Sequence, residues 1–429
     1  MLDLTPRPEK AVLVGVGMKS DNQAELENNL DELGQLAETA GAVVVGVLRQ
    51  RLERIVPATF IGSGKIEEIA RLKDETQANL VIVDVKLSGA QQRNIQELIG
   101  CKILDRAQLI LDIFAQRAQT REGKLQVELA QLKDQLPRLI GEAIAGLSRL
   151  AGGIGTRGPG ETKLEMDRRR IKTRIEQVTK ELEAVRKSRA LHRKRRQASH
   201  VPVISLAGYT NAGKSTLMNK LTNSDAYVEN KLFATLDPMT RKLRLPSGKQ
   251  VVMTDTVGFI NNLPHDLIEA FKATFEEIGA ADIIVHVHDA SHPFQVEQSE
   301  VVSKLLSEIG VSETPVIHVY NKMDLASGAV ERTTPREPPF VNVSALDGAG
   351  LDRLLSLIDQ HLQETAVPVD LYLPADEPGL IFNLARDGKI LFQEPNLDTI
   401  RCRVKLTEEA LQRWSQYLEN FNHHRDESH

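Results

Sequence analysis

The chain has 429 residues, of which 41% are hydrophobic and 26% charged, with a formal net charge of −5. This is the composition of an ordinary globular protein, and the length corresponds to about three domains. No apolar run approaches the roughly 18 residues of a membrane span, and the mixed-charge start is unlike a signal peptide. Cys101 and Cys402 lie far apart without metal-ligand spacing, which excludes a disulfide framework and favours a reducing, cytoplasmic location.

The charge is unevenly distributed along the chain. Residues 163–200 contain 14 Lys and Arg against 5 Asp and Glu, a net +9, so the rest carries −14. Such a segment is either a solvated helix face supported by Glu–Lys pairs or a binding site for a polyanion. Because it lacks aromatic side chains for stacking on single-stranded bases, we favour contact with the phosphates of structured RNA. The candidate contacts are Arg157, Arg168, Arg169, Arg170, Arg193, Lys194, Arg195 and Arg196.

Residues 1–118 alternate between strand-like and helix-like patterns, which predicts a small parallel α/β domain. The expected strands are 11–16, 42–48, 80–85 and 102–104, and the expected helices are 24–40, 64–77, 88–99 and 107–118. Residues 61–65 (I-G-S-G-K) open one helix and either hold an anion or form a plain turn, because they lack the full spacing of a phosphate loop.

Two helical patterns follow, each with a narrow heptad-like apolar seam. Pro137 lies inside the first and predicts a kink or restart there. Five glycines and a proline occupy residues 152–160 between the two patterns. We therefore expect an antiparallel hairpin of two helices of about 25 residues each. The glycine-rich loop at its tip is either a connector or an insertion that approaches RNA closely, with Arg157 available to phosphate.

From residue 201 to about 362 the strand and helix alternation returns, which predicts a doubly wound sheet. The expected strands are 201–207, 251–254, 283–288, 316–320 and 340–343, and the expected helices are 214–221, 267–278, 296–309 and 351–362. After Pro368 we expect a small α+β tail with a strand at 399–406 and a helix at 408–418.

The stretch Gly208 to Thr216, G-Y-T-N-A-G-K-S-T, lies between such a strand and helix. An ordinary glycine turn is the alternative, but this context is the one that a phosphate-binding loop requires. Its glycines let backbone N–H groups surround an anion at a helix N-terminus. Lys214 is placed to reach the β- and γ-phosphates and Ser215 to ligate Mg²⁺.

Further motifs follow in the order that GTP hydrolysis requires. Asp255 and Gly258 of D-T-V-G end a strand, where they suit a magnesium-bound water and the γ-phosphate. Asp324 of N-K-M-D also follows a strand, and its carboxylate is suited to the N1–H and amino group of guanine. Thr235, in the segment F-A-T-L-D, is the expected second magnesium ligand beside Ser215. The predicted GTP-binding residues are Gly208, Tyr209, Thr210, Asn211, Ala212, Gly213, Lys214, Ser215, Thr216, Phe233, Ala234, Thr235, Leu236, Asp237, Asp255, Thr256, Val257, Gly258, Asn321, Lys322, Met323, Asp324, Ser344, Ala345 and Leu346.

These motifs resemble those of translation-factor-class GTPases, and the whole chain resembles the HflX family within that class. The signatures are D-I-F-A-Q-R-A at 112–118, G-G-I-G-T-R-G-P-G-E-T at 152–162 and F-A-T-L-D-P at 233–238. The resemblance implies GTP binding and hydrolysis with Mg²⁺, association with the large (50S) ribosomal subunit, and splitting or rescue of stalled ribosomes under stress. The tail beyond Pro368 matches the family pattern less clearly.

Two positions bear on catalysis. Many GTPases place a water-orienting glutamine after the D-x-x-G glycine, but this chain has Phe259, and no catalytic residue is assigned. We expect an enzyme that is slow until a partner completes its site; the alternative is that Phe259 merely packs and the catalyst lies elsewhere. Asn211 is either a K⁺ ligand, as in related potassium-stimulated GTPases, or a residue suited to the turn.

We therefore expect an α/β chain with an N-terminal domain (1–118), a helical hairpin (119–200), a P-loop GTPase domain (201–365) and a C-terminal domain (366–429). We expect a monomer whose partners are GTP or GDP and the large ribosomal subunit with its rRNA, with any membrane contact peripheral. Two alternatives remain open. One is a regulatory switch that binds a protein effector and not RNA. The other is an ATP-dependent RNA remodeller built on Gly62 to Lys65, for which we identify no carboxylate Mg²⁺ site.

Overall fold

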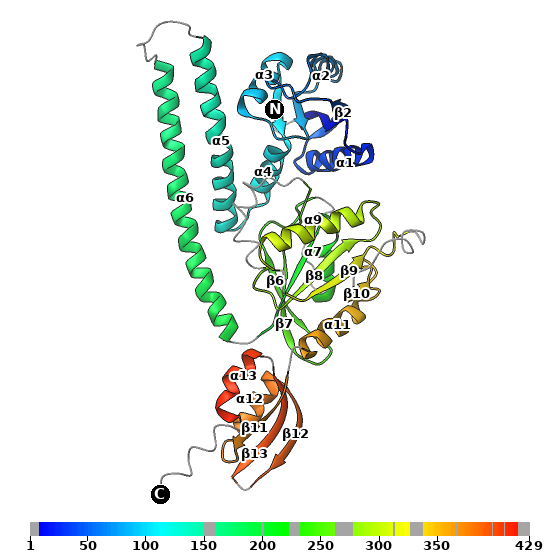
Figure 1. Ribbon diagram of the computed structural model, residues 1–429, viewed down its shortest axis with the longest axis vertical. Helices are drawn as coiled ribbons and strands as arrows, with labels where there is room; N and C mark the ends of the chain where they lie inside the picture. Colours follow the sequence, from blue (N-terminus) through cyan, green and yellow to red (C-terminus); the bar gives the residue numbers. More distant parts are fainter. Residues whose placement is uncertain are drawn as a thin grey trace, which may run out of the picture.

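Three β-sheets and a long helical hairpin make up the computed structural model (Figure 1). It describes residues 8–149, 159–198, 201–222, 232–261, 278–311, 314–326, 338–364, 367–396, 398–406 and 408–418. The mixed α/β architecture predicted from the sequence is confirmed. No helix in these ranges is long and apolar enough to span a bilayer.

The N-terminal sheet is parallel, with the strand order β2-β1-β3-β4. Leu33 of α1 and Phe114 of α4 pack in the core on one face, while Ile69 of α2 and Ile95 of α3 pack in the core on the other. The sheet is therefore covered by two pairs of helices. The elements are β1 Lys10–Met18, α1 Gln23–Thr39, β2 Val43–Leu52, α2 Ser63–Thr76, β3 Leu80–Val83, α3 Gly89–Ile99, β4 Lys102–Asp105 and α4 Arg106–Arg117.

The hairpin consists of α5 (Arg121–Arg149) and α6 (Pro159–Ala198), which run side by side in Figure 1. Leu125, Leu129, Val178 and Leu182 form its apolar seam. At 29 and 40 residues, both helices exceed the expected length. The expected glycine-rich tip lies outside the described residues except for Pro159 and Gly160, which begin α6.

Of the two outcomes expected at Pro137, a kink or a restart, the restart does not occur, because α5 is one helix with Pro137 inside it. The next residue explains this continuity. Arg138 donates to Asp105 at 2.9 Å and to Asp134 at 2.8 and 3.0 Å, and its backbone packs closely on Gly89 at the start of α3. These contacts hold the helix on both sides of the hydrogen bond that proline removes.

The second sheet has the order β10-β9-β8-β5-β7-β6, and only β6 is antiparallel to its neighbour. Leu217 of α7 and Leu354 of α11 pack on one face, and Val302 of α9 packs on the other. Strand β6 was not expected, and the helix expected at 267–278 lies almost entirely outside the described residues. The elements are β5 Val203–Gly208, α7 Lys214–Thr222, β6 Met239–Arg244, β7 Gln250–Asp255, β8 Ile283–Asp289, α9 Gln295–Glu308, β9 Val316–Asn321, β10 Phe340–Asn342 and α11 Leu351–Glu364.

The C-terminal sheet is antiparallel, with the order β11-β13-β12. Trp414 and Leu384 pack on it, which makes the small α+β unit that the sequence predicted, although β11, α12 and β12 were not expected. The elements are β11 Val367–Pro374, α12 Gly379–Asp387, β12 Lys389–Pro395, β13 Thr399–Leu406, α13 Glu408–Trp414 and the 3₁₀ turn η1 Ser415–Tyr417.

The first two sheets share one apolar core. It extends from α1 and α4 to Phe233, Phe259 and α9 of the second unit. The rings of Phe114 and Phe233 meet edge to face, with centroids 4.7 Å apart and an interplanar angle of 81°. The N-terminal unit therefore packs directly on the segments around Phe233 and Phe259, which lie beside the phosphate loop.

Candidate nucleotide site

The loop that joins β5 to α7 is tied to two other motifs through one asparagine. Gly213 has a φ of +95°, and a Cβ atom there would lie 2.2 Å from Asn321 Nδ2, so only glycine fits. The Asn321 amide donates to the Ala212 carbonyl at 2.9 Å, and its Oδ1 accepts from the Ala345 backbone N–H at 2.9 Å. The loop, the N-K-M-D motif and the S-A-L motif thus meet at one edge of the sheet.

Lys214 is held over the loop. Its side chain is buried, and Nζ donates to the carbonyl oxygens of Gly208 at 3.0 Å and Tyr209 at 2.8 Å. Burial lowers the pKa of Lys214 to about 8, although the nearby charge of Asp255 opposes the shift. An anionic phosphate beside this ammonium would therefore stabilise its charged form.

The side-chain oxygen atoms of three residues converge beside Lys214. Ser215 Oγ and Thr235 Oγ1 lie 2.9 Å apart, and they donate to Asp255 Oδ2 at 2.6 and 2.9 Å respectively. Burial raises the pKa of Asp255, whose other oxygen, Oδ1, is buried without a hydrogen-bond partner among the described residues. Two hydroxyls and a carboxylate are the hard ligands that Mg²⁺ prefers, so the donor set fits this ion.

The D-T-V-G segment closes against the loop. A Cβ atom on Gly258 would lie 2.9 Å from Thr210 Cα, so the close approach requires glycine. Phe259 N donates to the Gly208 carbonyl at 3.1 Å, and Thr210 N donates to the Phe259 carbonyl at 2.7 Å. The Phe259 side chain is fully buried in the shared core. Phe259 thus serves as a packing residue, which is one part of the alternative interpretation of this position. Its side chain has no group that can hydrogen-bond to water.

The cleft at the loop has a volume of about 50 Å³, well below that of an ordinary small-molecule site. Thr235 lines this cleft, and its hydroxyl lies 2.9 Å from both Ser215 Oγ and Asp255 Oδ2. The lining residues are Thr210, Asn211, Gly213, Lys214, Ser215, Thr216, Phe233, Ala234, Thr235, Thr256 and Gly258.

The expected guanine-binding residues lie at the other end of this edge. Lys322 has a φ of +62° and donates from Nζ to Asp289 Oδ2 at 2.6 Å. Met323 N donates to the Val343 carbonyl at 3.2 Å, which fixes the turn. Asp324 is exposed, and so is Leu346. The carboxylate of Asp324 is therefore accessible to a ligand.

Several expected site residues have structural partners instead. Asp237 accepts from the backbone N–H groups of Gln119 at 2.8 Å and Thr120 at 2.9 Å, and so holds the segment that leads into α5. Leu236 and Val257 are buried in the shared core. These three residues join the loop segments to the N-terminal unit and do not line the cleft.

Asn211 is exposed and adopts a φ of +61°. Asparagine tolerates this left-handed conformation better than most residues. The turn alone is therefore sufficient to account for the residue.

Sequence reasoning missed a buried polar network between the two units. Arg106, which is 3% exposed, donates to Asp84 at 2.8 Å and also to Glu32. Glu32 Oε1 accepts from the Tyr209 hydroxyl at 2.7 Å, and this hydroxyl accepts from Asn261 N at 2.8 Å. No local pattern marks these residues, because the network forms only when the two units pack together.

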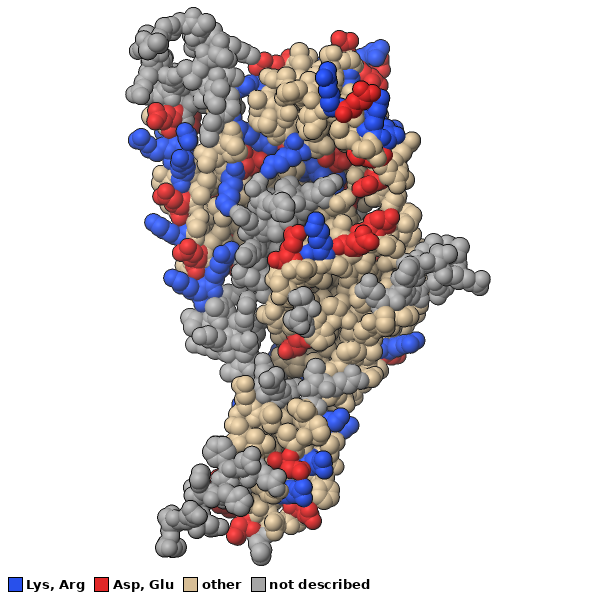
Figure 2. Space-filling model, viewed as in Figure 1, with Lys and Arg blue, Asp and Glu red and all other residues tan. Residues whose placement is uncertain are grey.

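Seven of the eight basic candidates lie on α6. Arg168, Arg169 and Arg170 are exposed, and Figure 2 shows Lys and Arg interspersed with Asp and Glu along the hairpin. Arg174 instead pairs with Glu128 of α5 at 2.6 and 2.9 Å. Arg157 and the side chains of Arg193, Lys194, Arg195 and Arg196 lie outside the described residues.

In the N-terminal unit, Gly62 precedes α2, and Lys65 Nζ pairs with Glu68 at 2.5 Å. The lysine is thus engaged by its own helix.

A phosphate loop on a doubly wound sheet, with ordered motifs at the strand ends, defines a P-loop GTPase. Family models match consecutive parts of the chain: a GTP-binding GTPase N-terminal region over 27–115, a GTP-binding GTPase middle region over 117–196 and a 50S ribosome-binding GTPase over 203–322. The chain belongs to the HflX family of GTPases.

Two relatives illustrate the similarity. GTPase HflX of Caldanaerobacter subterraneus subsp. tengcongensis is 48% identical over 419 residues, which cover 97% of this chain and 96% of the relative. GTPase HflX of Escherichia coli is 43% identical over 95% of this chain and 96% of its own. Among solved structures, a GTP-binding protein from Sulfolobus solfataricus in complex with GDP is 25% identical. It has a TM-score of 0.43, with 82% of this chain and 98% of that chain covered.

Proposed function

We propose that this GTPase binds GTP with Mg²⁺ at the edge of the second sheet and acts on the large ribosomal subunit, splitting or rescuing stalled ribosomes. The observation that carries the nucleotide assignment is the convergence on Asn321 of the phosphate loop, N-K-M-D and S-A-L motifs. In this assignment residues 208–216 bind the phosphates and Asp324 selects guanine.

Ser215 and Thr235 would hold the magnesium ion, with Asp255 behind them. A bound magnesium ion neutralises charge on the β- and γ-phosphates. Lys214 stabilises the same phosphates, and the N–H of Gly258 is placed to sense the γ-phosphate. Because Thr235 donates to Asp255 in this structure, ligation of magnesium by Thr235 would replace an internal hydrogen bond. Hydrolysis releases the segment again, so the nucleotide acts as a timer.

The proposed ribosome contact rests on the hairpin. Helix α6 alone has 40 residues and extends roughly 60 Å at 1.5 Å per residue. Its exposed Arg168, Arg169 and Arg170 are available to rRNA phosphates. One family model that matches this chain bears the description of a 50S ribosome-binding GTPase. A switch that acted only on a protein effector would not need a basic arm of this length.

We propose the four-unit organisation as the framework for this activity: an N-terminal domain to residue 118, the hairpin to 200, the G-domain to 365 and the C-terminal domain. The hairpin would deliver the loop 152–160, with Arg157, to a functional centre of the ribosome.

The proposed role is tested by replacing residues 153–158 with a serine-rich linker of equal length. We expect unchanged GTP affinity, modestly weaker subunit binding and loss of ribosome splitting. A matched variant replaces Arg168, Arg169 and Arg170 with glutamate, which should weaken subunit binding and reduce its salt dependence. If splitting survives the linker replacement, the loop is only a connector.

A further inference from the structure

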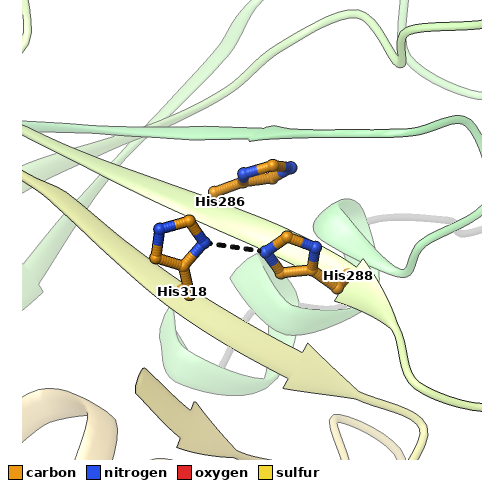
Figure 3. Close-up of side chains that lie close together, drawn as sticks. All are labelled: His286, His288 and His318. Carbon is orange, nitrogen blue, oxygen red and sulfur yellow. Dashed lines mark hydrogen bonds between the residues drawn. The ribbon is translucent and has the colours of Figure 1, made fainter. Parts of the chain in front are cut away.

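Three histidines meet on one buried face of the second sheet, beside strand β5, which leads into the phosphate loop. His286 and His288 alternate along β8, and His318 lies on β9 directly opposite His286 in the strand register. All three side chains therefore project from the same face and point toward one another (Figure 3). Their exposed fractions are 1%, 4% and 8%.

The three rings offer converging nitrogen atoms. One ring nitrogen from each histidine lies within 4.8 Å of the other two. His288 Nε2 and His318 Nδ1 are hydrogen-bonded at 3.0 Å, as drawn in Figure 3. The ring centroids of His286 and His288 are 3.9 Å apart. Within the described residues, this is the one group of three or more His, Cys, Asp and Glu side chains with the proximity needed to hold a metal ion.

Burial favours the neutral form of two of the three histidines. Burial lowers the pKa of His288 to about 3, and burial together with its two neighbours holds the pKa of His286 far below its usual range. Neutral imidazole is the form that ligates. Neither of these two rings therefore has to lose a proton before a metal binds.

We propose that His286, His288 and His318 form a binding site for one divalent late first-row transition metal, with Zn²⁺ as the best match. Three imidazoles suit such ions, whereas Mg²⁺ and Ca²⁺ prefer oxygen. A tetrahedral zinc site with bonds of 2.0–2.1 Å places its nitrogen ligands about 3.4 Å apart. A bound metal would draw the three nitrogen atoms from separations of up to 4.8 Å toward this value, with water as the fourth ligand.

Gln295 supplies the outer support that a ligating histidine needs. It is the buried first residue of α9, and its side-chain amide lies 3.4 Å from His288 Nδ1. When His288 ligates through Nε2, the ring proton resides on Nδ1. A flip of the Gln295 amide then presents its oxygen to accept that proton. Such partners fix the tautomer of the ligand and raise its basicity.

Metal binding does not require any histidine to release a proton to solvent. In the hydrogen bond between His288 and His318, one of the two facing nitrogens carries a hydrogen. Metal binding breaks this hydrogen bond, and the proton moves to the other nitrogen of the same ring. Each imidazole stays neutral, and the metal brings its two positive charges into a site that Lys214 already makes electrostatically positive toward His286. Repulsion from Lys214 lowers the affinity for any cation. Only an ion that bonds strongly to nitrogen is therefore expected to bind here.

The experiment uses the full-length protein, freed of metal with a chelator and without nucleotide. Excess Mg²⁺ is included to compete with zinc for the oxygen ligands at Ser215 and Asp255. Equilibrium dialysis against ZnCl₂, followed by metal analysis, should give about one zinc per chain. Co²⁺ in place of zinc should give the visible absorption of a four-coordinate nitrogen site. Zinc well below one equivalent together with a featureless cobalt spectrum would overturn the proposal.

Variants assign the ion to these residues. His288→Gln should weaken zinc binding by more than about 100-fold, and Gln295→Leu, which leaves the three ligands in place, by about 10- to 100-fold. His361→Gln is the matched control, because His361 lies on α11 at the opposite face of the sheet and bonds to its own helix. Zinc binding that persists unchanged in His288→Gln, or that is lost equally in His361→Gln, contradicts the site. If His288→Gln fails to fold, the wild-type cobalt spectrum and Gln295→Leu still decide the question.

Discussion

The hydroxyl of Tyr209 in the phosphate loop donates to the carboxylate of Glu32 in α1 at 2.7 Å. Burial raises the pKa of this tyrosine, and the adjacent carboxylate raises it further, so the hydroxyl keeps its proton. The same oxygen accepts from the backbone N–H of Asn261 at 2.8 Å, two residues beyond Phe259. One side chain therefore links the N-terminal unit, the phosphate loop and the segment after D-T-V-G.

Removing this hydroxyl should loosen the segment after D-T-V-G. In Tyr209→Phe the buried N–H of Asn261 loses its acceptor, at a cost of about 1–3 kcal/mol. We expect hydrogen exchange in the peptide 255–261 to accelerate by about 5- to 150-fold, as measured by mass spectrometry. The control Tyr417→Phe, in the C-terminal unit, should leave that peptide unchanged. Equal exchange in Tyr209→Phe and wild type would show that the network does not restrain the segment.

GTP affinity should depend on pH through Lys214. Its pKa is about 8 in the protein without nucleotide, and a bound triphosphate raises it. The charge interaction is therefore fully present below pH 8, and it weakens as the pH rises further because binding must then take up a proton. We expect Kd to be constant from pH 6.5 to about 7.5 and to rise by up to tenfold per unit above pH 8. Titration calorimetry in buffers of different ionisation enthalpy measures the proton uptake; its absence at pH 8.5 would refute the shift.

Guanine selection is assigned to the exposed carboxylate of Asp324. Loss of charge-assisted hydrogen bonds costs about 1.5–3 kcal/mol each, or at least about tenfold in affinity. Asp324→Asn should therefore weaken GTP and strengthen xanthosine triphosphate, whose 2-oxo group pairs with the amide N–H. Fluorescence competition with both nucleotides measures the exchange. An unchanged GTP affinity in Asp324→Asn would show that Asp324 does not select guanine.

Turnover by the protein alone should be slow, because Phe259 is buried where other GTPases orient water. If Asn211 ligates K⁺, single-turnover hydrolysis will be faster in KCl than in NaCl. Asn211→Gly separates ligation from turn geometry, since glycine accepts the same φ of +61°. That variant should keep its GTP affinity and lose the difference between the two salts. Equal rates in both salts for the wild type would show that Asn211 does not ligate K⁺ and serves only the conformation of the turn.

The sequence indicates which motifs meet at the candidate site because each motif is local. The phosphate loop, D-T-V-G and N-K-M-D each follow an apolar strand, and the carboxyl ends of adjacent parallel strands meet at one edge of a sheet. Lys214, Ser215 and Asp255 therefore come together as their order along the chain indicates. The overall α/β class follows from the same alternation.

Long-range packing decides the rest. Asp237 lies in a predicted nucleotide-binding segment but accepts hydrogen bonds from the backbone that precedes α5, a contact that exists only because the two units share a core. Strand β6 (M-T-R-K-L-R) has a weak β pattern and forms because β7 offers a hydrogen-bonding edge. Helix α5 continues through Pro137 because Arg138 is anchored in the N-terminal unit. None of these outcomes is encoded in a short window of residues.

We infer control of large-subunit binding by GTP, which is recognised through Asp324. The most direct test of this inference is co-sedimentation of the purified protein with large subunits in the presence of non-hydrolysable GTP or xanthosine triphosphate analogues, or GDP. We predict that the wild type pellets only with the GTP analogue and that Asp324→Asn pellets only with the xanthosine analogue. Binding of both proteins regardless of nucleotide, or of neither with any nucleotide, would contradict the account.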